Sequence, residues 1–553
     1  MSVRNIPEKD KNMIFVRFSV AFVFAVMLCS KNFARAEDGK LELPTSEARG
    51  EIFDAMQQEI ERLDGATLQV RLARSEPWKN TMSRLRAEAV AANSLAAWAR
   101  ALNRVDNTYP NLHSYIEYGS AFRAALPRRV RFSVDFFAEV HSTRKSEFKI
   151  SWIDSDLNSG SELRPQVGDR LIAINGRSMN EWRRENVIFC KFALPSQCDR
   201  ELRNNFRAEL LGWSRSEPLS YTLERSGVRW NIAVPLLEPT MLSEKYADMH
   251  ECALTPSRYT GFTLSYAGNR ACVYESANRS DTAILRITRF NYRKSGTKSS
   301  IKSASEEVAA LRPWWNEHAN WKHLIIDVIG NGGGQAPIEF YRMLLPEAFQ
   351  EQYVRLRKLF ELDDPNLRNG ILWNSQEHEI WFQNLREHGS YDATKIGSFL
   401  PPVPQFCAEE NRDCTQGTFT PYGHPFLGRV SILVDQFCIS SCDGFVWQLA
   451  DKLRGRVRFV GQPPAGDTAW SRLIIDVVPD DKRSGFFKTA VRPLYSEPPV
   501  ERVYSQIVNI SLSTDAQGNR LDGIPFSVDR FVPRTLENSN NWHNEALEAA
   551  LED

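Results

Sequence analysis

Two buried strands and the turns that follow them constrain the fold of this 553-residue chain more than any other feature. The apolar run HLIIDVIG (323–330) leads into the glycine turn NGGG (331–334), and RVSILVD (429–435) leads into a turn that contains serines. After the second turn, apolar residues recur at helical spacing from about 442 to 453. Strands that alternate with helices in this way predict an α/β core, which we place over residues 241–553.

The length and the balanced charge of the chain exclude several classes of protein. A chain of 553 residues is too long for one ordinary hydrophobic core, so several domains are expected. Its 69 basic and 69 acidic residues give a formal net charge of zero, without the basic excess of a nucleic-acid-binding protein. Neither nucleic acid nor a membrane surface is therefore expected as a partner.

Residues 1–36 have the pattern of a secretory signal peptide. Basic residues precede the apolar stretch Met13–Leu28, and the small-residue sequence Ala34-Arg35-Ala36 precedes the acidic Glu37. Cleavage is expected after Ala36, and the mature protein would then be periplasmic or secreted and would carry no stable membrane span. The alternative is a retained membrane anchor, for which the apolar stretch is short.

Removal of such a signal leaves eight cysteines, and an even number favours disulfides in an exported protein. Pairing of neighbours along the chain predicts Cys190–Cys198, Cys252–Cys272, Cys407–Cys414 and Cys438–Cys442. Other connectivities stay open on sequence alone. A metal site is not expected, because no CxxC pair with histidine partners occurs.

The part of the chain before the α/β core changes character once. Over residues 37–127 the apolar residues have helical spacing, which predicts an N-terminal helical domain. Over 128–240 strand-like runs replace the helices. Within them RPQVGDRLIAINGRSM (164–179) resembles the PDZ-domain pattern of a turn, a short strand and an Asn-Gly turn. We therefore expect a multi-domain α+β protein with a PDZ-like β-domain over 128–240.

Ser440 lies in the turn between the strand 429–435 and the following helix. A serine in such a turn is exposed at the end of the sheet, where the helix N-terminus offers free N–H groups to a developing oxyanion. The simpler alternative is that Ser440 only caps the helix, which is a common use of serine.

Three motifs around these residues resemble the C-terminal processing and tricorn-core serine proteases. The segment Cys438–Phe445 is similar to the family's T-x-S-A-[AS]-E-x-F, with Ser440 at the nucleophile and Asp443 at the glutamate. LIIDVIGNGGG (324–334) is similar to LIlDLRxNxGG, and LDGIPFSVDRFVP (521–533) is similar to x-E-G-x-G-V-x-P-D-x-x-V. The resemblance implies a crotonase-like or ClpP-like protease core and the hydrolysis of peptide bonds.

The resemblance also implies roles for individual residues. Gly333 or Gly334, with the N–H of Ser441, would form the oxyanion hole, and Asp522 would orient the proton relay. A nucleotide-binding loop is the alternative for the glycine turn, but the turn lacks the Lys-Ser/Thr of a P-loop and the spacing G-x-G-x-x-G. No metal or organic cofactor is implied.

The resemblance points to His113 as the proton acceptor for Ser440. In the Ser-Lys branch of the family a lysine follows the T-x-G motif directly, but Asp467 stands there in this chain. The tricorn-like branch instead carries a histidine before the PDZ domain, and NTYPNLHSYIEYG (107–119) provides His113. His141 is the second candidate.

Together these features predict a secreted or periplasmic serine endopeptidase that acts on polypeptides through a Ser-His relay, with substrate presented by the PDZ-like domain. Two other classes stay open. One is a non-catalytic binding protein on the same core, like the interphotoreceptor retinoid-binding relatives, and the other is a PDZ scaffold on a degenerate protease core. Reaction with a fluorophosphonate probe would separate the enzyme from both. The oligomeric state does not follow from the sequence.

Overall fold

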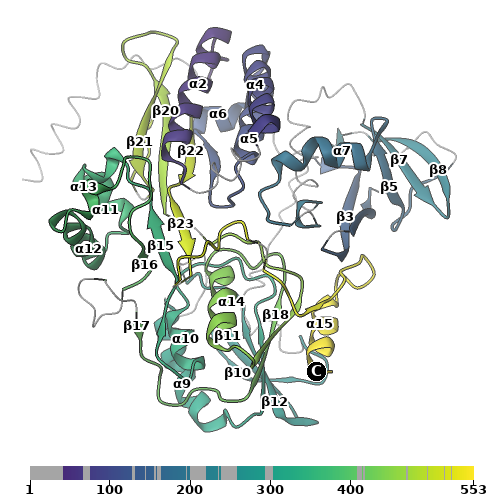
Figure 1. The fold of residues 1–553 in the computed structure, drawn as a ribbon. Helices are drawn as coiled ribbons and strands as arrows, with labels where there is room; N and C mark the ends of the chain where they lie inside the picture. The colour runs from purple at the N-terminus through teal and green to yellow at the C-terminus, as the bar shows by residue number, and fades with distance from the viewer. Residues whose placement is uncertain are drawn as a thin grey trace, which may run out of the picture. The chain divides into compact units, whose positions relative to one another are not determined.

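The computed structural model describes most of the chain after residue 40 (Figure 1). The described residues are 41–65, 75–126, 131–143, 145–154, 157, 163–194, 196–199, 219–234, 236–237, 258–292, 303–407, 414, 418–468, 471–494, 496–515, 517–524 and 526–552. The expected signal peptide, residues 1–36, lies outside them. Among the described residues, no helix is both long enough and apolar enough to cross a membrane.

A seven-stranded sheet forms the centre of the expected α/β core. Its strands follow the order β10 (Thr263–Ala267), β11 (Ala271–Ser276), β12 (Arg279–Ile287), β13 (His323–Asp327), β18 (Arg429–Val434), β19 (Val457–Gly461) and β24 (Arg530–Phe531). Neighbours from β12 to β24 are parallel, whereas β10, β11 and β12 pair antiparallel. In β13 and β18, Leu324 lies opposite Val430, so the two strands end at the same edge of the sheet.

Helices bury both faces of this sheet, because successive side chains of a strand point to opposite faces. Leu324 and Ile326 of β13 belong to a cluster with α9 (Ala304–His318), α10 (Ile338–Leu344) and α14 (Ser441–Lys452). Ile325 belongs to a second cluster with α15 (Trp542–Leu551). Figure 1 shows α15 apart from the other three helices. This layered packing is typical of α/β cores, as the alternation of strands and helices predicts.

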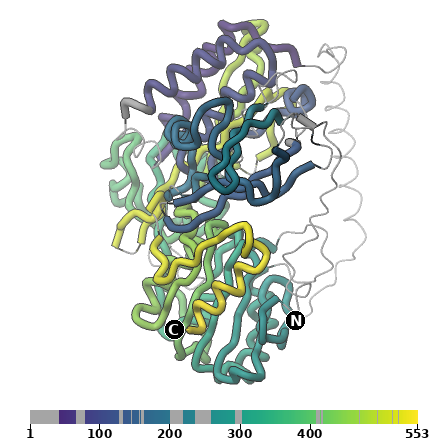
Figure 2. The backbone as a smooth tube through the Cα atoms, turned by 90° about the vertical axis from the view of Figure 1, so that its right-hand side faces the viewer, coloured from purple at the N-terminus to yellow at the C-terminus, as the bar shows by residue number. Residues whose placement is uncertain are grey.

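A second, four-stranded sheet combines strands from both ends of the chain. Its order is β1 (Tyr115–Tyr118), β22 (Tyr504–Asn509), β20 (Arg472–Pro479) and β21 (Phe487–Pro493). The expected N-terminal helices are α2 (Ser46–Leu63), α4 (Ser75–Ala91), α5 (Leu95–Asn107) and α6 (Ser120–Ala125). Helix α2 packs on β20 and β21, and Figures 1 and 2 both show the purple helices beside the yellow-green strands. The helical region 37–127 therefore shares contacts with strands of the region 241–553.

The region 128–240 forms a sheet of its own. Its elements are β3 (Val134–Ser142), β4 (Lys145–Ile153), β5 (Arg170–Ile174), β6 (Arg177–Ser178), helix α7 (Met179–Asn186), β7 (Leu219–Arg225) and β8 (Val228–Val234). The PDZ-like motif extends from the turn before β5 into α7. In that turn the Asp169 carboxylate accepts the N–H of Gln166 at 2.6 Å. After β5, Asn175 and Gly176 reverse the chain with positive φ, as the Asn-Gly pair predicts.

The remaining elements are short. Two-residue and four-residue strands form small sheets: β2 (Arg131–Phe132) with β9 (Leu236–Leu237), β14 (Phe349–Gln350) with β17 (Thr418–Phe419), and β15 (Tyr353–Leu356) with β16 (Val403–Pro404) and β23 (Ser511–Thr514). The other helices are η1 (Val187–Phe189), η4 (Phe360–Leu362), α11 (Pro365–Ile371), α12 (Gln376–Glu387) and α13 (Ser390–Ala393).

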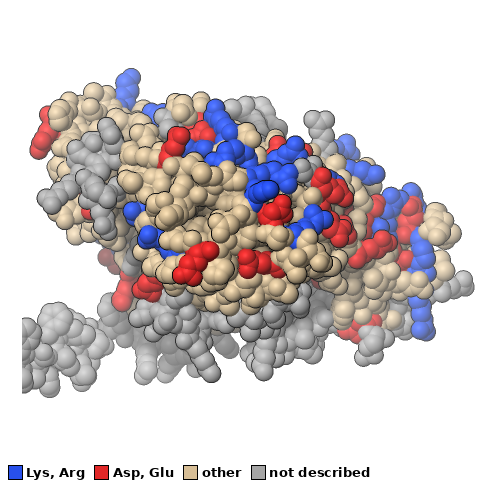
Figure 3. All heavy atoms as spheres, turned by 90° about the horizontal axis from the view of Figure 1, so that it is seen from below, with Lys and Arg blue, Asp and Glu red and all other residues tan. Residues whose placement is uncertain are grey.

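Surface charge is mixed in sign on the face that Figure 3 draws. Lys and Arg side chains lie there beside Asp and Glu side chains, and neither sign forms a continuous field. Exposed ion pairs show the same mixture, for example Arg177 with Glu185 at 2.8 Å. This pattern agrees with the balanced composition of the sequence.

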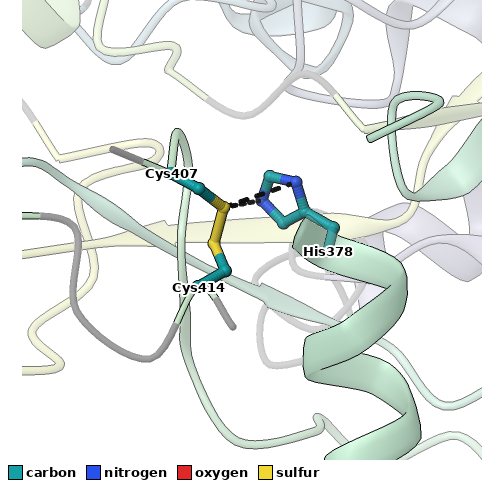
Figure 4. Close-up of side chains that lie close together, drawn as sticks. All are labelled: His378, Cys407 and Cys414. Atoms are coloured by element: carbon teal, nitrogen blue, oxygen red, sulfur yellow. Dashed lines mark hydrogen bonds between the residues drawn. A yellow bond between two sulfur atoms is a disulfide. The ribbon is translucent and has the colours of Figure 1, made fainter. Parts of the chain in front are cut away.

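Three of the four expected disulfides are present: Cys190–Cys198, Cys407–Cys414 and Cys438–Cys442. The fourth prediction, Cys252–Cys272, is wrong, because Cys272 is a free thiol buried in β11. Cys252 itself lies outside the described residues. Figure 4 shows the Cys407–Cys414 disulfide against the ring of His378 on α12, with Nε2 3.6 Å from the Cys407 Sγ. Because the two sulfurs are bonded to each other, they offer no thiolate to a metal ion.

We expect Arg286→Met to lower the free energy of unfolding by about 3 kcal/mol. Arg286 is buried and donates to the Asp327 carboxylate at 2.5 Å, at the end of β13. Without this arginine the fully buried carboxylate loses its nearer cation. Urea denaturation followed by circular dichroism measures the effect.

Arg279→Met is the matched control, because Arg279 is exposed at the start of the same strand, β12. It should change the free energy of unfolding by less than about 0.5 kcal/mol. Equal stability of the two variants would contradict the role of Arg286.

Candidate active site

Ser440 lies in a strained turn between β18 and α14. Its backbone angles are φ 62° and ψ −125°, a region that residues with a side chain seldom adopt. The strand stops where the apolar run ends, and the Asp435 carboxylate then accepts the N–H groups of Phe437 at 3.1 Å and Gly330 at 3.0 Å. A strand-to-helix turn of this kind exposes the serine side chain above the end of the sheet.

Two further links hold this turn. The Cys438–Cys442 disulfide brackets it, and the Ser440 N–H donates to the main-chain carbonyl of Asp467 at 2.8 Å. The Ser440 side chain makes no capping hydrogen bond to α14, so the simple role as a helix cap is not what the structure shows. Its hydroxyl lies instead against His113.

His113 connects Ser440 to a carboxylate. Its Nε2 lies 2.9 Å from Ser440 Oγ, and its Nδ1 lies 2.9 Å from Asp467 Oδ1. The histidine is on the loop between α5 and β1, and only 12% of its side chain is exposed. A carboxylate at Nδ1 holds the ring proton on that nitrogen and leaves the Nε2 lone pair facing the serine hydroxyl.

The loop before His113 is attached to Asp467 at several points. The Asp467 carboxylate accepts the N–H of Leu112 and, at 3.4 Å, the side-chain amide of Asn111. The side-chain oxygen of Asn111 in turn accepts the main-chain N–H of His113 at 2.9 Å. Asn111 therefore fixes the backbone of the histidine relative to its carboxylate partner.

The structure places a different carboxylate at His113 from the one that the sequence resemblance assigned to the relay. The oxygens of Asp522 accept the N–H and the hydroxyl of Thr468, at 3.0 and 2.8 Å, and the N–H of Ser513 at 2.6 Å. Asp522 thus holds the residue after Asp467, whereas Asp467 itself contacts His113. Burial raises the pKa of Asp522 to about 6. One feature of the sequence could have pointed to Asp467 as the partner of His113: it occupies the position where the Ser-Lys branch has its lysine.

Asp443 supports the same loop from α14. It is fully buried, and its carboxyl accepts the N–H of Asp467 at 2.7 Å. Burial raises the pKa of Asp443 to about 8, although the hydrogen bond from the Asp467 N–H opposes the change. Near neutral pH the group is therefore mostly protonated and adds little negative charge beside Asp467.

The glycine turn 331–334 lies against the turn that contains Ser440. Gly333 has φ 80°, and a Cβ there would come within 2.8 Å of the Ser440 Cβ. Its N–H donates to the Asn331 side chain at 2.9 Å and is therefore not free for an oxyanion. Within the described part of the chain, the N–H groups of Gly334 and Ser441 have no protein acceptor. Of the three residues predicted for an oxyanion hole, the geometry favours Gly334 and Ser441.

The disulfide loop 190–198 contacts both sides of the site. Lys191 donates from Nζ to the main-chain carbonyl of Ser114 at 2.5 Å, directly after the histidine. Gln197 donates from Nε2 to the main-chain carbonyls of residues 463 and 464, at 2.9 and 2.6 Å. Because this loop follows α7 and η1, the region with the PDZ-like motif reaches the residues that position the histidine and the carboxylate.

His141, the second candidate for the base, belongs to an ion-pair group on β3 and β4. Its Nε2 lies 3.2 Å from Glu147 and 3.4 Å from the buried Glu139. These three residues could in principle hold a metal ion. Lys149 already contacts Glu139 at 2.9 Å, however, and a cation at that carboxylate competes with a metal. We interpret the group as an ion-pair network of the sheet.

Solved structures share this fold. The structure of mature CPAF complexed with lactacystin matches with a TM-score of 0.56 and 14% identity, over 91% of this chain and 98% of that chain. The fold is that of CPAF. A crystal structure of a serine-to-alanine CPAF mutant matches with a TM-score of 0.54 and 13% identity, over 92% of this chain and 98% of the mutant.

Other comparisons are weaker. The photosystem II D1 C-terminal processing protease matches with a TM-score of 0.34 and 11% identity, over 89% of this chain and 96% of that chain. No protein-family model and no curated protein matches the sequence.

We expect Gly333→Ala to slow the reaction of Ser440 with a fluorophosphonate by about 100-fold or more. The added Cβ would collide with the Ile439 carbonyl and approach the Ser440 Cβ and the Ser441 nitrogen, so the nucleophile turn must shift. The second-order labelling rate measures the effect.

Gly332→Ala is the control, since Gly332 has open space around it and no positive φ. That variant should label at close to the rate of the unmodified protein. Equal labelling of both variants would show that the contact between the glycine turn and the nucleophile is unimportant.

Proposed function

We propose that the protein is a serine endopeptidase in which Ser440, His113 and Asp467 form the catalytic relay. The observation that carries this proposal is the pair of 2.9 Å contacts of the His113 ring, one with Ser440 Oγ and one with Asp467 Oδ1. These residues come from three separate segments, and they line up as nucleophile, base and orienting carboxylate. The strained backbone of Ser440 and the fold shared with CPAF support the same proposal.

The proposed reaction is acyl transfer followed by hydrolysis. Ser440 Oγ attacks the carbonyl carbon of a peptide bond while its proton passes to His113 Nε2. His113 returns the proton to the amine nitrogen, the C–N bond breaks, and an ester on Ser440 remains. Water then attacks the ester with His113 again as the base, which releases the acid and restores the hydroxyl. Asp467 holds the ring and stabilises the imidazolium in both steps.

The oxyanion of each tetrahedral intermediate is proposed to bind the N–H groups of Gly334 and Ser441. The two residues are in contact, since the Ser441 hydroxyl donates to the Gly334 carbonyl at 2.8 Å, and Ser441 is the first residue of α14. The N-terminal end of a helix carries partial positive charge, which favours an anion at that place.

The wider assignments are proposals on the same basis. Residues 37–127 would be a helical domain, 128–240 a PDZ-like domain and 241–553 a crotonase-like core. The PDZ-like domain would bind an extended polypeptide by strand addition, and the disulfide loop 190–198 gives it a path to the site. A histidine base supports the tricorn-like branch. The three disulfides support export to an oxidising compartment, periplasmic or extracellular.

Ser440→Ala should abolish labelling by a fluorophosphonate, whereas Ser441→Ala should retain most of it. Only Ser440 has its hydroxyl on His113, while the Ser441 hydroxyl donates to the Gly334 carbonyl at 2.8 Å. Mass spectrometry of the labelled peptide identifies the modified serine. Labelling at Ser441 would shift the nucleophile by one position, and unmodified protein that takes no label would favour the non-catalytic binding protein.

His113→Ala should reduce the labelling rate by at least about 1,000-fold, and Asp467→Asn by about 100-fold or more, with the fold retained. An asparagine at 467 can donate to Nδ1, which favours the wrong ring tautomer. Asp522→Asn should reduce the labelling rate by less than about tenfold, since Asp522 acts on the loop around Asp467 through Thr468 and Ser513. A larger loss in Asp522→Asn than in Asp467→Asn would reverse the assignment of the carboxylate.

A further inference from the structure

A cavity of about 180 Å³ lies along the C-terminal half of α14, away from the end that carries the nucleophile. Its wall combines residues 350–352, which join β14 to β15, with Trp447, Gln448 and the last turn of α14. Arg454, just after α14, and Asp515 and Leu521, from the segment after β23, complete it. A cavity of this size has room for several waters or for one small organic group.

Glu351 is the polar group in this wall that lacks a protein partner. Its side chain is 4% exposed, and within the described part of the chain its buried Oε2 has no hydrogen-bond partner. The residues on both sides of it are fixed. Gln448 donates to the Gln350 carbonyl at 2.7 Å, and Gln352 donates to the Gly444 carbonyl at 3.0 Å. The backbone around Glu351 is therefore fixed at the cavity wall, while its carboxyl Oε2 has no hydrogen-bond donor among the described residues.

The other acidic groups of the cavity are already occupied. On α14, Asp451 pairs with Lys452 at 2.7 Å and with Arg454 at 3.0 Å. Asp515 accepts the main-chain N–H groups of Gln517 and Asn519 at 2.9 and 2.8 Å. A further titratable group near Glu351 is the buried Tyr341 of α10, which stays neutral because burial raises its pKa. Burial likewise raises the pKa of Glu351 well above its ordinary value, so the empty cavity holds the neutral acid.

We propose that this cavity binds an aliphatic ammonium or guanidinium group, with the Glu351 carboxylate as its counter-ion. The last turn of a helix carries partial negative charge, so the end of α14 favours a cation over an anion. The indole of Trp447 adds an aromatic wall, which also favours cations, and Leu521 offers apolar surface to an alkyl stem. The cation would be a free small amine or the side chain of a lysine or arginine in a peptide.

Binding of the cation exchanges one proton. The Glu351 carboxylic acid releases its proton to solvent, and the resulting carboxylate pairs with the ligand, whose own charge is unchanged. Affinity therefore rises with pH, by about tenfold for each pH unit as long as Glu351 stays protonated in the empty protein. The hydrogen bond and ion pair with Lys452 and the pairing with Arg454 lower the pKa of Asp451, so its ionisation does not contribute to the rise.

Isothermal titration calorimetry with n-butylammonium, at about pH 6 and about pH 8, tests the proposal on the full-length Ser440→Ala protein. Saturable binding that tightens with pH is expected, and butan-1-ol, which lacks the charge, should bind at least about tenfold more weakly. Glu351→Gln should remove both the binding and its pH dependence. Glu347→Gln, an exposed change close by in the sequence, should leave both unchanged.

The proposal is overturned if n-butylammonium does not bind, if Glu351→Gln binds it equally well, or if affinity is independent of pH. A thermal melt of Glu351→Gln guards against misfolding, and an unchanged melting temperature is expected because glutamine has the shape of the neutral acid. Competition by a blocked Gly-Arg-Gly peptide would identify a peptide side chain as the ligand, and competition by agmatine alone would identify a free amine. The titration uses the Ser440→Ala variant, which lacks the proposed nucleophile. A failure of n-butylammonium to bind would therefore leave the proposed peptidase activity untouched.

Discussion

The hydrogen bond between the Ser440 N–H and the main-chain carbonyl of Asp467 is the contact on which the rest of the site depends. Through its carbonyl Asp467 positions Ser440, through its carboxylate it contacts His113, and through its N–H it is held by Asp443. One residue thus sets the distance between the serine and the histidine. Because displacements near 1 Å can cost about 100-fold in rate, a shift of this loop would affect every member of the proposed relay at once.

The strained turn at Ser440 explains why so many separate contacts converge there. A left-handed backbone at a residue with a side chain costs about 1–3 kcal/mol and persists only where its surroundings determine it. The Cys438–Cys442 disulfide limits the turn from within, and Asp435 ties its start to Gly330, the residue before the glycine turn. The contact of Gly333 with Ser440 leaves no room for a Cβ, so a glycine is required at the point of closest approach.

The sequence predicted the parts of this arrangement that follow from local pattern. Apolar strands, the turn before α14 and the glycine turn are encoded within a few residues each, and short-range pairing predicted three disulfides. The partner of His113 depends instead on how the loop before Asp467 folds back over Ser440, and no local pattern reports that contact. Cys272 shows the same limit of local pattern. It is a free thiol buried in β11, and its proximity in sequence to another cysteine does not reveal that burial.

The three buried aspartates around this loop are kept from repelling one another by their different environments. Burial raises the pKa of Asp443 to about 8, so near neutral pH it is mostly uncharged, and it raises that of Asp522 to about 6, so that group is mostly ionised. Asp522 is ionised where Thr468 and Ser513 stabilise its charge. Asp467 lies between them and directs its carboxylate to His113. If Asp443 were ionised, its charge would add to that of Asp522 in the same buried loop, and after burial this repulsion is one of the causes that keep the Asp443 pKa high. A neutral Asp443 still accepts the Asp467 N–H, so it holds the loop without adding a charge beside the carboxylate that contacts His113.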